Sequence, residues 1–121
     1  MRRKVKSIMI VRNLKDKEVL DTTYIAHGGA VARMVLDQRT LKEIGFLASA
    51  ILDKGKKIES HVDSMEEIYF IIMGEGKMSV GEETRHVIPG DAVWIPAGAA
   101  HALENTGEEL LFLMVVASPN W

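Results

Sequence analysis

Turn signals built from glycine and proline recur at short intervals along this chain of 121 residues. They separate apolar runs that are short for helices but have the usual length of strands. The clearest runs are residues 30–36, 46–52, 92–95 and 110–117. Short strands with a turn between successive members are typical of an antiparallel sandwich or barrel. The chain is therefore predicted to be all-β, with little helix.

The other segments are assigned less directly. We expect a first strand at residues 7–11, and weak helical or irregular structure at residues 13–23. Residues 61–73 are predicted to be strand-like throughout. Residues 68–72 within this segment are apolar at both parities, so both faces of the strand should be covered. A second subunit or the N-terminal segment could cover the outer face, and we favour a homodimer because two-fold dimers are the commonest assembly.

Length and composition limit the possible partners. The length suits one domain, divided into an N-terminal arm with the first strand or strands at residues 1–28 and a barrel at residues 29–121. The formal charge of −2 predicts no binding to nucleic acid, and no apolar segment is long enough to span a membrane. The chain has no cysteine, which suits a cytoplasmic location and excludes thiolate metal ligands.

Two imidazoles and two carboxylates occur at spacings that suggest a metal site. His61, Asp63 and Glu67 share parity, so an unbroken strand would place them on one face, although residues 64–66 could hold a bend. His101 follows the turn at Pro96-x-Gly98 and must reach the others through tertiary pairing. Imidazole and carboxylate together suit Mn, Fe, Zn, Ni or Co, and the two carboxylates favour the harder ions.

These residues fall into two segments that resemble the two signature motifs of the cupin superfamily. The matching positions are Gly55, His61, Glu67 and Gly74 in the first segment, and Gly90, Pro96, Gly98, His101 and Asn105 in the second. The one departure is Asp63, where the family pattern has its second histidine. The resemblance implies a double-stranded β-helix, or jelly-roll barrel, with a divalent metal inside and frequent dimerisation. Asp63 could ligate the metal or hydrogen-bond a ligand histidine, and a barrel that has lost its metal is the alternative.

The resemblance implies a metal-dependent oxygenase, isomerase or lyase that acts on a small polar or anionic molecule such as a carboxylate or sugar. A ligand-binding or sensor protein without turnover is the alternative. Three further residues are candidates for the chemistry: Tyr69 on the inner face, His27 before two glycines, and Arg33 within an apolar strand. Each also has a plain structural interpretation, as a core tyrosine, a loop histidine and an arginine in an edge or interface salt bridge.

The remaining notable side chains are expected to be structural. Met73, Phe112 and Met114 are predicted to fill the barrel interior. Asn105 is expected to tie its loop by hydrogen bonds, and His86 is expected to be exposed on a hairpin strand.

Overall fold

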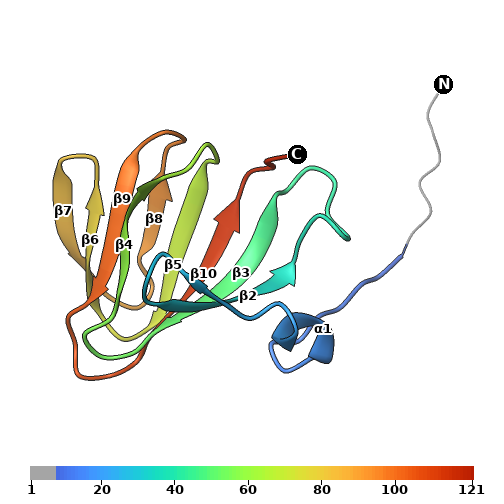
Figure 1. Ribbon diagram of the computed structural model, residues 1–121, viewed down its shortest axis with the longest axis horizontal. Helices are drawn as coiled ribbons and strands as arrows, with labels where there is room; N and C mark the ends of the chain where they lie inside the picture. Colours follow the sequence, from blue (N-terminus) through green and yellow to red (C-terminus); the bar gives the residue numbers. More distant parts are fainter. Residues whose placement is uncertain (1–7) are drawn as a thin grey trace.

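The computed structural model describes residues 8–121, which form one short helix and ten strands (Figure 1). In chain order the elements are α1 Lys17–Leu20, β1 Tyr24–Ala26, β2 Ala30–Leu36, β3 Phe46–Leu52, β4 Lys57–Val62, β5 Glu67–Met73, β6 Gly76–Val80, β7 Glu83–Val87, β8 Ala92–Ile95, β9 Ala100–Asn105 and β10 Leu111–Ala117. The prediction of an all-β chain with little helix is confirmed.

The strands form two antiparallel sheets that face each other across one core. The larger sheet has the order β1-β2-β3-β10-β5-β8, and the smaller has the order β4-β9-β6-β7. Neighbours in each sheet are often far apart in sequence, so the chain passes repeatedly between the two layers. Figure 1 shows the smaller sheet at one side of the molecule and α1 beside β2 at the other.

The alternation of side chains along the strands creates the core. In β10, Leu111, Leu113, Val115 and Ala117 are buried while the residues between them are partly exposed. The inner faces of both sheets contribute to one cluster, for example Leu52 and Ile71 from the larger sheet and Met78 and Leu103 from the smaller. Burial at every second position is the pattern expected for a sheet with one face on the core.

Two predicted strands differ from the structure. The strand expected at residues 7–11 is wrong, because residues 8–11 have no strand structure and the first strand is β1. Residue 7 lies outside the described residues, as does the start of the expected N-terminal arm. Residues 61–73 are two strands and not one, because β4 ends at Val62 and β5 begins at Glu67 in the other sheet. The bend that the sequence allowed at residues 64–66 is present between them. The intervening residues carry the chain from one layer to the other.

The expectation that three apolar side chains fill the interior is also wrong. Phe112 and Met114 alternate with the buried residues of β10, and Met73 is 50% exposed at the end of β5. All three belong to the outer face of the larger sheet, where Phe112 pairs with Met73 and Met114 pairs with Phe70. Because apolar residues occupy both parities of these strands, periodicity alone did not distinguish the inner face from the outer.

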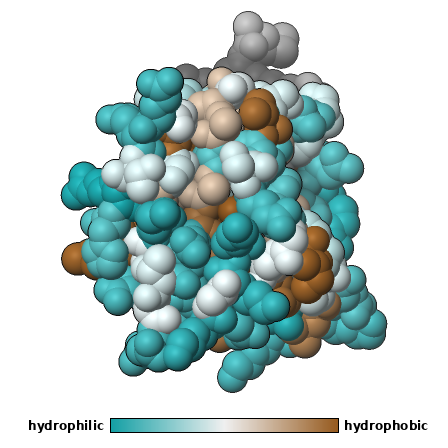
Figure 2. All heavy atoms as spheres, turned by 60° about the vertical axis from the view of Figure 1, so that its left-hand side comes forward, coloured by the Kyte–Doolittle hydropathy of each residue, from teal (hydrophilic) through white to brown (hydrophobic). Residues whose placement is uncertain are grey.

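The two outer faces differ in chemistry. The side of the molecule that carries the smaller sheet is mostly hydrophilic (Figure 2). The outer face of the larger sheet exposes apolar side chains on β5 and β8, including Ile68, Phe70 and Trp94, which are 42%, 41% and 60% exposed. The described N-terminal segment therefore leaves much of this face open. No helix within residues 8–121 has the length and apolar character needed to cross a membrane.

Candidate metal centre

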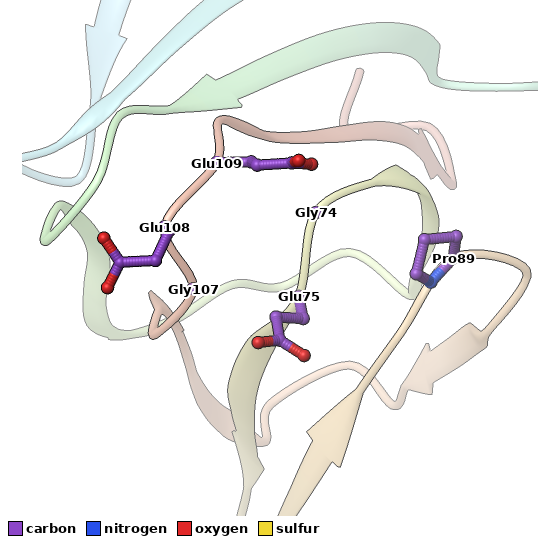
Figure 3. Close-up of a pocket in the computed structure, with 6 residues that line it drawn as sticks. All are labelled: Gly74, Glu75, Pro89, Gly107, Glu108 and Glu109. Atoms are coloured by element: carbon purple, nitrogen blue, oxygen red, sulfur yellow. The ribbon is translucent and has the colours of Figure 1, made fainter.

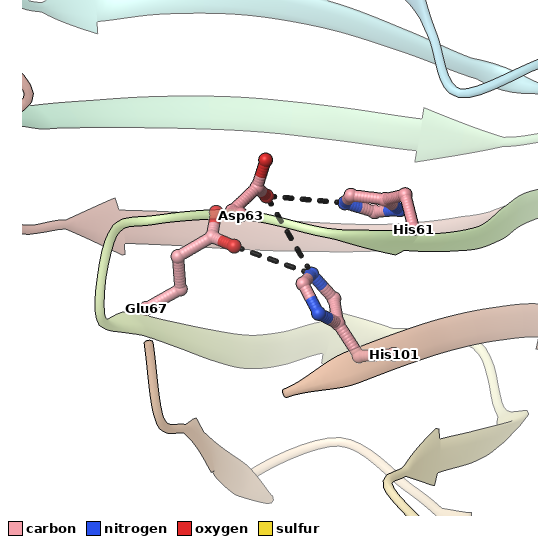
Figure 4. Close-up of side chains that lie close together, drawn as sticks. All are labelled: His61, Asp63, Glu67 and His101. Carbon is pink, nitrogen blue, oxygen red and sulfur yellow. Dashed lines mark ion pairs between the residues drawn. The ribbon is translucent and has the colours of Figure 1, made fainter. Parts of the chain in front are cut away.

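Four side chains converge at one end of the space between the sheets. His61 lies near the end of β4, Asp63 lies in the connection to β5, Glu67 begins β5, and His101 lies at the start of β9 (Figure 4). Each offers a ligand atom, and these four atoms all lie within 4.8 Å of one another. The smaller sheet supplies both imidazoles and the larger sheet supplies Glu67. The structure thus brings together the four residues that the sequence singled out.

Local structure sets the position of each side chain. His61 and His101 are directly opposite each other across the β4–β9 pair. The Gly98 amide donates to the Asp63 carbonyl at 2.8 Å, so the turn before His101 is tied to the connection that carries Asp63. Gly98 has a φ of +84°, in the left-handed region where glycine is favoured. The two halves of the sequence pattern therefore meet through a backbone hydrogen bond as well as through the four side chains.

The distances suit ligands around a single ion. Nε2 of His61 is 3.2 Å from Oδ2 of Asp63, and Nε2 of His101 is 3.7 Å from the same oxygen. Nε2 of His101 is also 3.2 Å from Oε1 of Glu67. Ligand bonds of about 2.1 Å give neighbouring ligand atoms separated by about 3.0–3.4 Å in octahedral or tetrahedral geometry.

Backbone carbonyls orient both imidazoles. Nδ1 of His61 lies 2.8 Å from the Glu59 carbonyl, and Nδ1 of His101 lies 2.9 Å from the Ala99 carbonyl. A carbonyl can only accept, so Nδ1 is the donor in each contact, and a neutral ring held in this way presents an unprotonated Nε2 to the cluster. Asp63 lies on the Nε2 side of both rings. It therefore faces the point where a metal would sit and does not fix either tautomer from behind.

Burial makes the cluster costly without an ion. Glu67 and His101 are 5% and 2% exposed, and neither Glu67 Oε1 nor His101 Nε2 has a hydrogen-bond partner among the described residues. Burial raises the pKa of Glu67, and the nearby Asp63 carboxylate adds to this. Burial alone would lower the pKa of His101, but Glu67 and the Ala99 carbonyl outweigh it and raise that pKa. Two unsatisfied buried atoms aimed at one point fit the donor set of a divalent cation.

His27 lies against the cluster and is held there tightly. Its ring stacks on His61 with centroids 3.3 Å apart and planes 8° from parallel. The turn that carries it is pressed onto β4, because the Glu59 amide donates to the His27 carbonyl at 2.8 Å. A Cβ at Gly29 would lie 2.2 Å from the Lys57 carbonyl oxygen, so only glycine allows this approach. His27 itself has a φ of +47°, which is rare for a residue with a side chain.

The other two candidate residues differ in position. Tyr69 follows Glu67 on the inner face, is 3% exposed, and meets His101 edge to face with ring centroids 5.8 Å apart. Burial raises the pKa of Tyr69 far above its ordinary value, so its hydroxyl keeps its proton. Arg33 is not brought to the cluster. It alternates with the inward Ala30 and Ala32 on β2, and its Nε donates to Thr23 Oγ1 at 2.9 Å.

Sequence reasoning did not identify the residues beside the cluster. A cavity of about 70 Å³ adjoins His61 and Glu67, and Tyr24 and several alanines of β1, β2 and β3 contribute to its wall. Burial raises the pKa of Tyr24 as well. The available signal was the repeated Ala-x-Ala spacing at residues 30–32 and 48–50.

A second hollow, of about 370 Å³, lies at the other end of β5 (Figure 3). Gly74, Pro89, Gly107 and three glutamates, Glu75, Glu108 and Glu109, line it. Glu75 pairs with His86, which is exposed as predicted, and Glu108 pairs with Lys54. These are exposed ion pairs, so the hollow lacks the buried, converging donors of the cluster.

Nearby, Asn105 ties its loop as predicted, through hydrogen bonds to the Leu52 and Glu109 carbonyls and the Gly107 amide.

Comparison with known proteins agrees with this architecture. The family model described as "Cupin domain" matches residues 48–117. An uncharacterised protein of Streptomyces coelicolor is 30% identical over 100 residues, covering 83% of this chain and 90% of the relative. An uncharacterised protein of Methanocaldococcus jannaschii is 34% identical over 99 residues, covering 79% and 78%.

Solved structures share the fold. The crystal structure of a predicted oxalate decarboxylase from Thermotoga maritima has a TM-score of 0.75 to this chain at 24% sequence identity, covering 92% of this chain and 99% of the other. At this identity the likeness concerns the fold alone. It confirms the predicted double-stranded β-helix.

Proposed function

Because the chain belongs to the cupin family, we propose that it binds one divalent transition metal through His61, Asp63, Glu67 and His101 and acts as a metal-dependent enzyme on a small molecule. The main observation behind the proposal is that the four donor atoms point towards one position. Both Nε2 atoms are freed by hydrogen bonds at Nδ1, and both carboxylates lie on the same side. Mn, Fe, Zn and Ni are the ions that suit two imidazoles and two carboxylates.

The geometry supports Asp63 as a ligand. Its Oδ2 lies within 3.7 Å of both Nε2 atoms, on the side that a metal would occupy. Its side chain is 23% exposed, which leaves a path from the cluster towards solvent. Four protein ligands leave one or two positions free on a five- or six-coordinate ion. Free positions are needed for a substrate or a reacting molecule to bind.

The proposed reaction class depends on the chemistry that a bound ion would supply. A bound divalent ion would polarise a substrate oxygen as a Lewis acid. The chain itself offers no nucleophilic cysteine, since it has none. An oxygenase, isomerase or lyase reaction is proposed, because the resemblance to cupins implies these classes for a metal-dependent member. The similarity of the fold to a predicted oxalate decarboxylase supports a carboxylate as one substrate type.

Two neighbouring side chains are proposed to assist. Tyr69 keeps its hydroxyl proton because burial raises its pKa, so it can donate a hydrogen bond to a substrate beside His101. His27 covers the outer side of His61 through its stacked ring and limits the movement of that ligand. His27 is thus proposed as a positioning residue, and Tyr69 as a group that contacts substrate.

Metal analysis tests the proposal directly. Protein purified without added metal, and then dialysed against Mn, Fe, Zn or Ni, is expected to retain about one ion per chain by elemental analysis. His101→Ala and Asp63→Ala should each weaken binding at least tenfold. The matched controls are His86→Ala and Asp53→Ala, which remove exposed side chains away from the cluster and should bind like the parent.

The outcomes separate the alternatives. Protein that gains no metal on titration would refute the enzyme proposal and leave a barrel with a polar interior. Metal binding that survives Asp63→Ala unchanged would remove Asp63 from the ligand set. Stoichiometric metal and tight ligand binding without turnover would support the alternative of a sensor or binding protein.

We also propose a homodimer through the outer face of the larger sheet. Ile68, Phe70 and Trp94 are exposed there, and β10 continues the apolar surface with Phe112 and Met114. A broad apolar face of one sheet can pack against a copy of itself about a two-fold axis. Phe70→Glu should convert a dimer to a monomer in light scattering, while a monomeric parent would refute the proposal.

A cytoplasmic location stays a prediction, which cell fractionation would test.

A further inference from the structure

The cavity beside the cluster is small, and alanine is the residue type that occurs most often in its wall. Its volume is about 70 Å³, roughly that of two waters in the liquid. Five alanines line it: Ala26, Ala30, Ala32, Ala48 and Ala50. His61 and Glu67 also line it, so the cavity borders two of the four metal-binding donors, and Tyr69 lines it beside them.

The alanines lie where strands usually carry larger side chains. Ala32 of β2 pairs with Ala50 of β3, and Ala26 of β1 pairs with Ala30 of β2. Alanine is disfavoured in strands relative to valine and isoleucine, which fill a sheet surface better. Ala30, Ala32 and Ala50 are at most 4% exposed, and buried strand positions of this kind usually carry larger apolar residues. Larger side chains at these three positions would occupy the cavity. Small residues can also serve close packing, but here a cavity of about 70 Å³ lies beside them.

The charge of the wall limits what can enter. No lysine or arginine lines the cavity among the residues that the structure describes, and Arg33 points to Thr23 instead. The carboxylate in its wall is that of Glu67, which repels an anion unless a metal lies between them. A sugar phosphate or another multiply charged molecule would therefore find no counter-charge away from the metal. Tyr69 offers its hydroxyl as a neutral polar group.

We propose that the ligand of this site is a small molecule with one metal-binding oxygen group and a short apolar tail, and that the tail occupies the cavity lined by alanines. This inference rests on the proposed metal function. It narrows the substrate to short-chain acids, keto or hydroxy compounds of a few carbons, and it excludes sugars and sugar phosphates.

A homologous series of ligands tests the inference. The protein is loaded with Zn²⁺, its metal content is measured, and acetohydroxamate, butyrohydroxamate and hexanohydroxamate are titrated by calorimetry. The hydroxamate group binds the metal in every case, so differences report on the tail. Affinity should rise about fourfold per added methylene while the tail enters the cavity, and should level off once the cavity is full. Glucose 6-phosphate should not compete at equal concentrations.

Substitutions in the wall identify where the tail binds. Ala32→Val and Ala50→Val should bind Zn²⁺ and acetohydroxamate like the parent but lose the gain from longer tails. Ala50→Gly should move the levelling-off to a longer tail, and this variant keeps the test open if the valine variants fail to fold. Ala92→Val, at an exposed position on β8, should behave like the parent.

The outcomes separate this inference from the metal proposal. Zn²⁺ binding with no dependence on tail length, or tighter binding of glucose 6-phosphate than of butyrohydroxamate, would overturn the inference and leave the metal site standing. A dependence on tail length that persists in both valine variants would also overturn it. Protein that binds none of Mn, Fe, Zn and Ni would refute both. If it binds one of the other ions and not Zn²⁺, the titrations are made with that ion.

Discussion

The Glu67→Gln variant should stabilise the metal-free protein while abolishing metal binding. Glu67 is 5% exposed and its ligand oxygen lies within 4.8 Å of that of Asp63. Two full charges at this separation repel by about 3 kcal/mol at an effective dielectric constant of about 20. Asp63 is partly solvated and His101 offsets some of the charge, so we expect a net gain of about 1–2 kcal/mol from the neutral, isosteric amide.

Urea denaturation in the presence of a chelator measures this effect. A gain of 1–2 kcal/mol, with a slope of about 2 kcal/mol per molar urea, raises the midpoint by about 0.5–1 M. Adding Zn²⁺ should stabilise the parent by about 2.7 kcal/mol at a hundredfold excess over its dissociation constant, and should not stabilise the variant. Glu82→Gln, which neutralises an exposed carboxylate in a turn, is the control and should change neither quantity.

The result that refutes this reasoning is a metal-free Glu67→Gln protein less stable than the parent by 1 kcal/mol or more. Glu67 would then be an integral part of the core, stabilised by His101 as a buried pair. A more stable Glu67→Gln protein would instead show that the Glu67 carboxylate lowers stability, as is common for groups retained for function.

Three further predictions concern stability and pH. Asn105→Ala should lower the free energy of unfolding by about 2–4 kcal/mol in denaturant titrations, because it leaves one buried carbonyl and two partly buried backbone groups without their hydrogen-bond partner. Gly29→Ala should cost about 1–3 kcal/mol by the same measurement and also weaken Zn²⁺ binding, since its Cβ would lie 2.2 Å from a β4 carbonyl oxygen; unchanged metal affinity would show that the turn does not support the cluster. The folded-state pKa values of Glu67 and His101 are both raised, so the folded protein binds protons more tightly than the unfolded chain. Their contribution to stability is complete at low pH and is lost as pH rises through the folded pKa values. The melting temperature of metal-free protein should therefore decrease as the pH is raised above the ordinary pKa values of a glutamate and a histidine. A flat or rising profile would contradict the pKa directions.

The sequence predicted strands well where turn residues bracket an apolar run. Residues 30–36, 46–52 and 92–95 are strands with those bounds. It failed at residues 61–73, because parity counting assumes that a strand stays in one sheet. The cluster forms because the chain leaves the smaller sheet after Val62 and enters the larger one at Glu67, which a local pattern cannot reveal.

The four clustered residues were predicted because their spacing is fixed along the chain, whereas their surroundings depend on tertiary contacts. For His27 the sequence allowed either a functional role or that of a loop histidine. Its contact with His61 depends on how the turn between β1 and β2 packs on β4, which the local sequence does not show. Arg33 looked suited to an anion from its type alone, but β2 turns it away from the cluster. When both parities of a short strand are apolar, packing decides which residues face the core, and the local sequence does not.

The donors come from both layers of the barrel, with His61 and His101 on one sheet, Glu67 on the other and Asp63 on the connection between them. An ion held by all four would act as a clasp across the layers, and its radius would set how far apart they stand at that end. The alanine-lined cavity lies between the same layers. Exchanging a smaller ion for a larger one would therefore change the volume available to a ligand. The metal that binds and the size of the substrate that fits would then both depend on the distance between the two sheets.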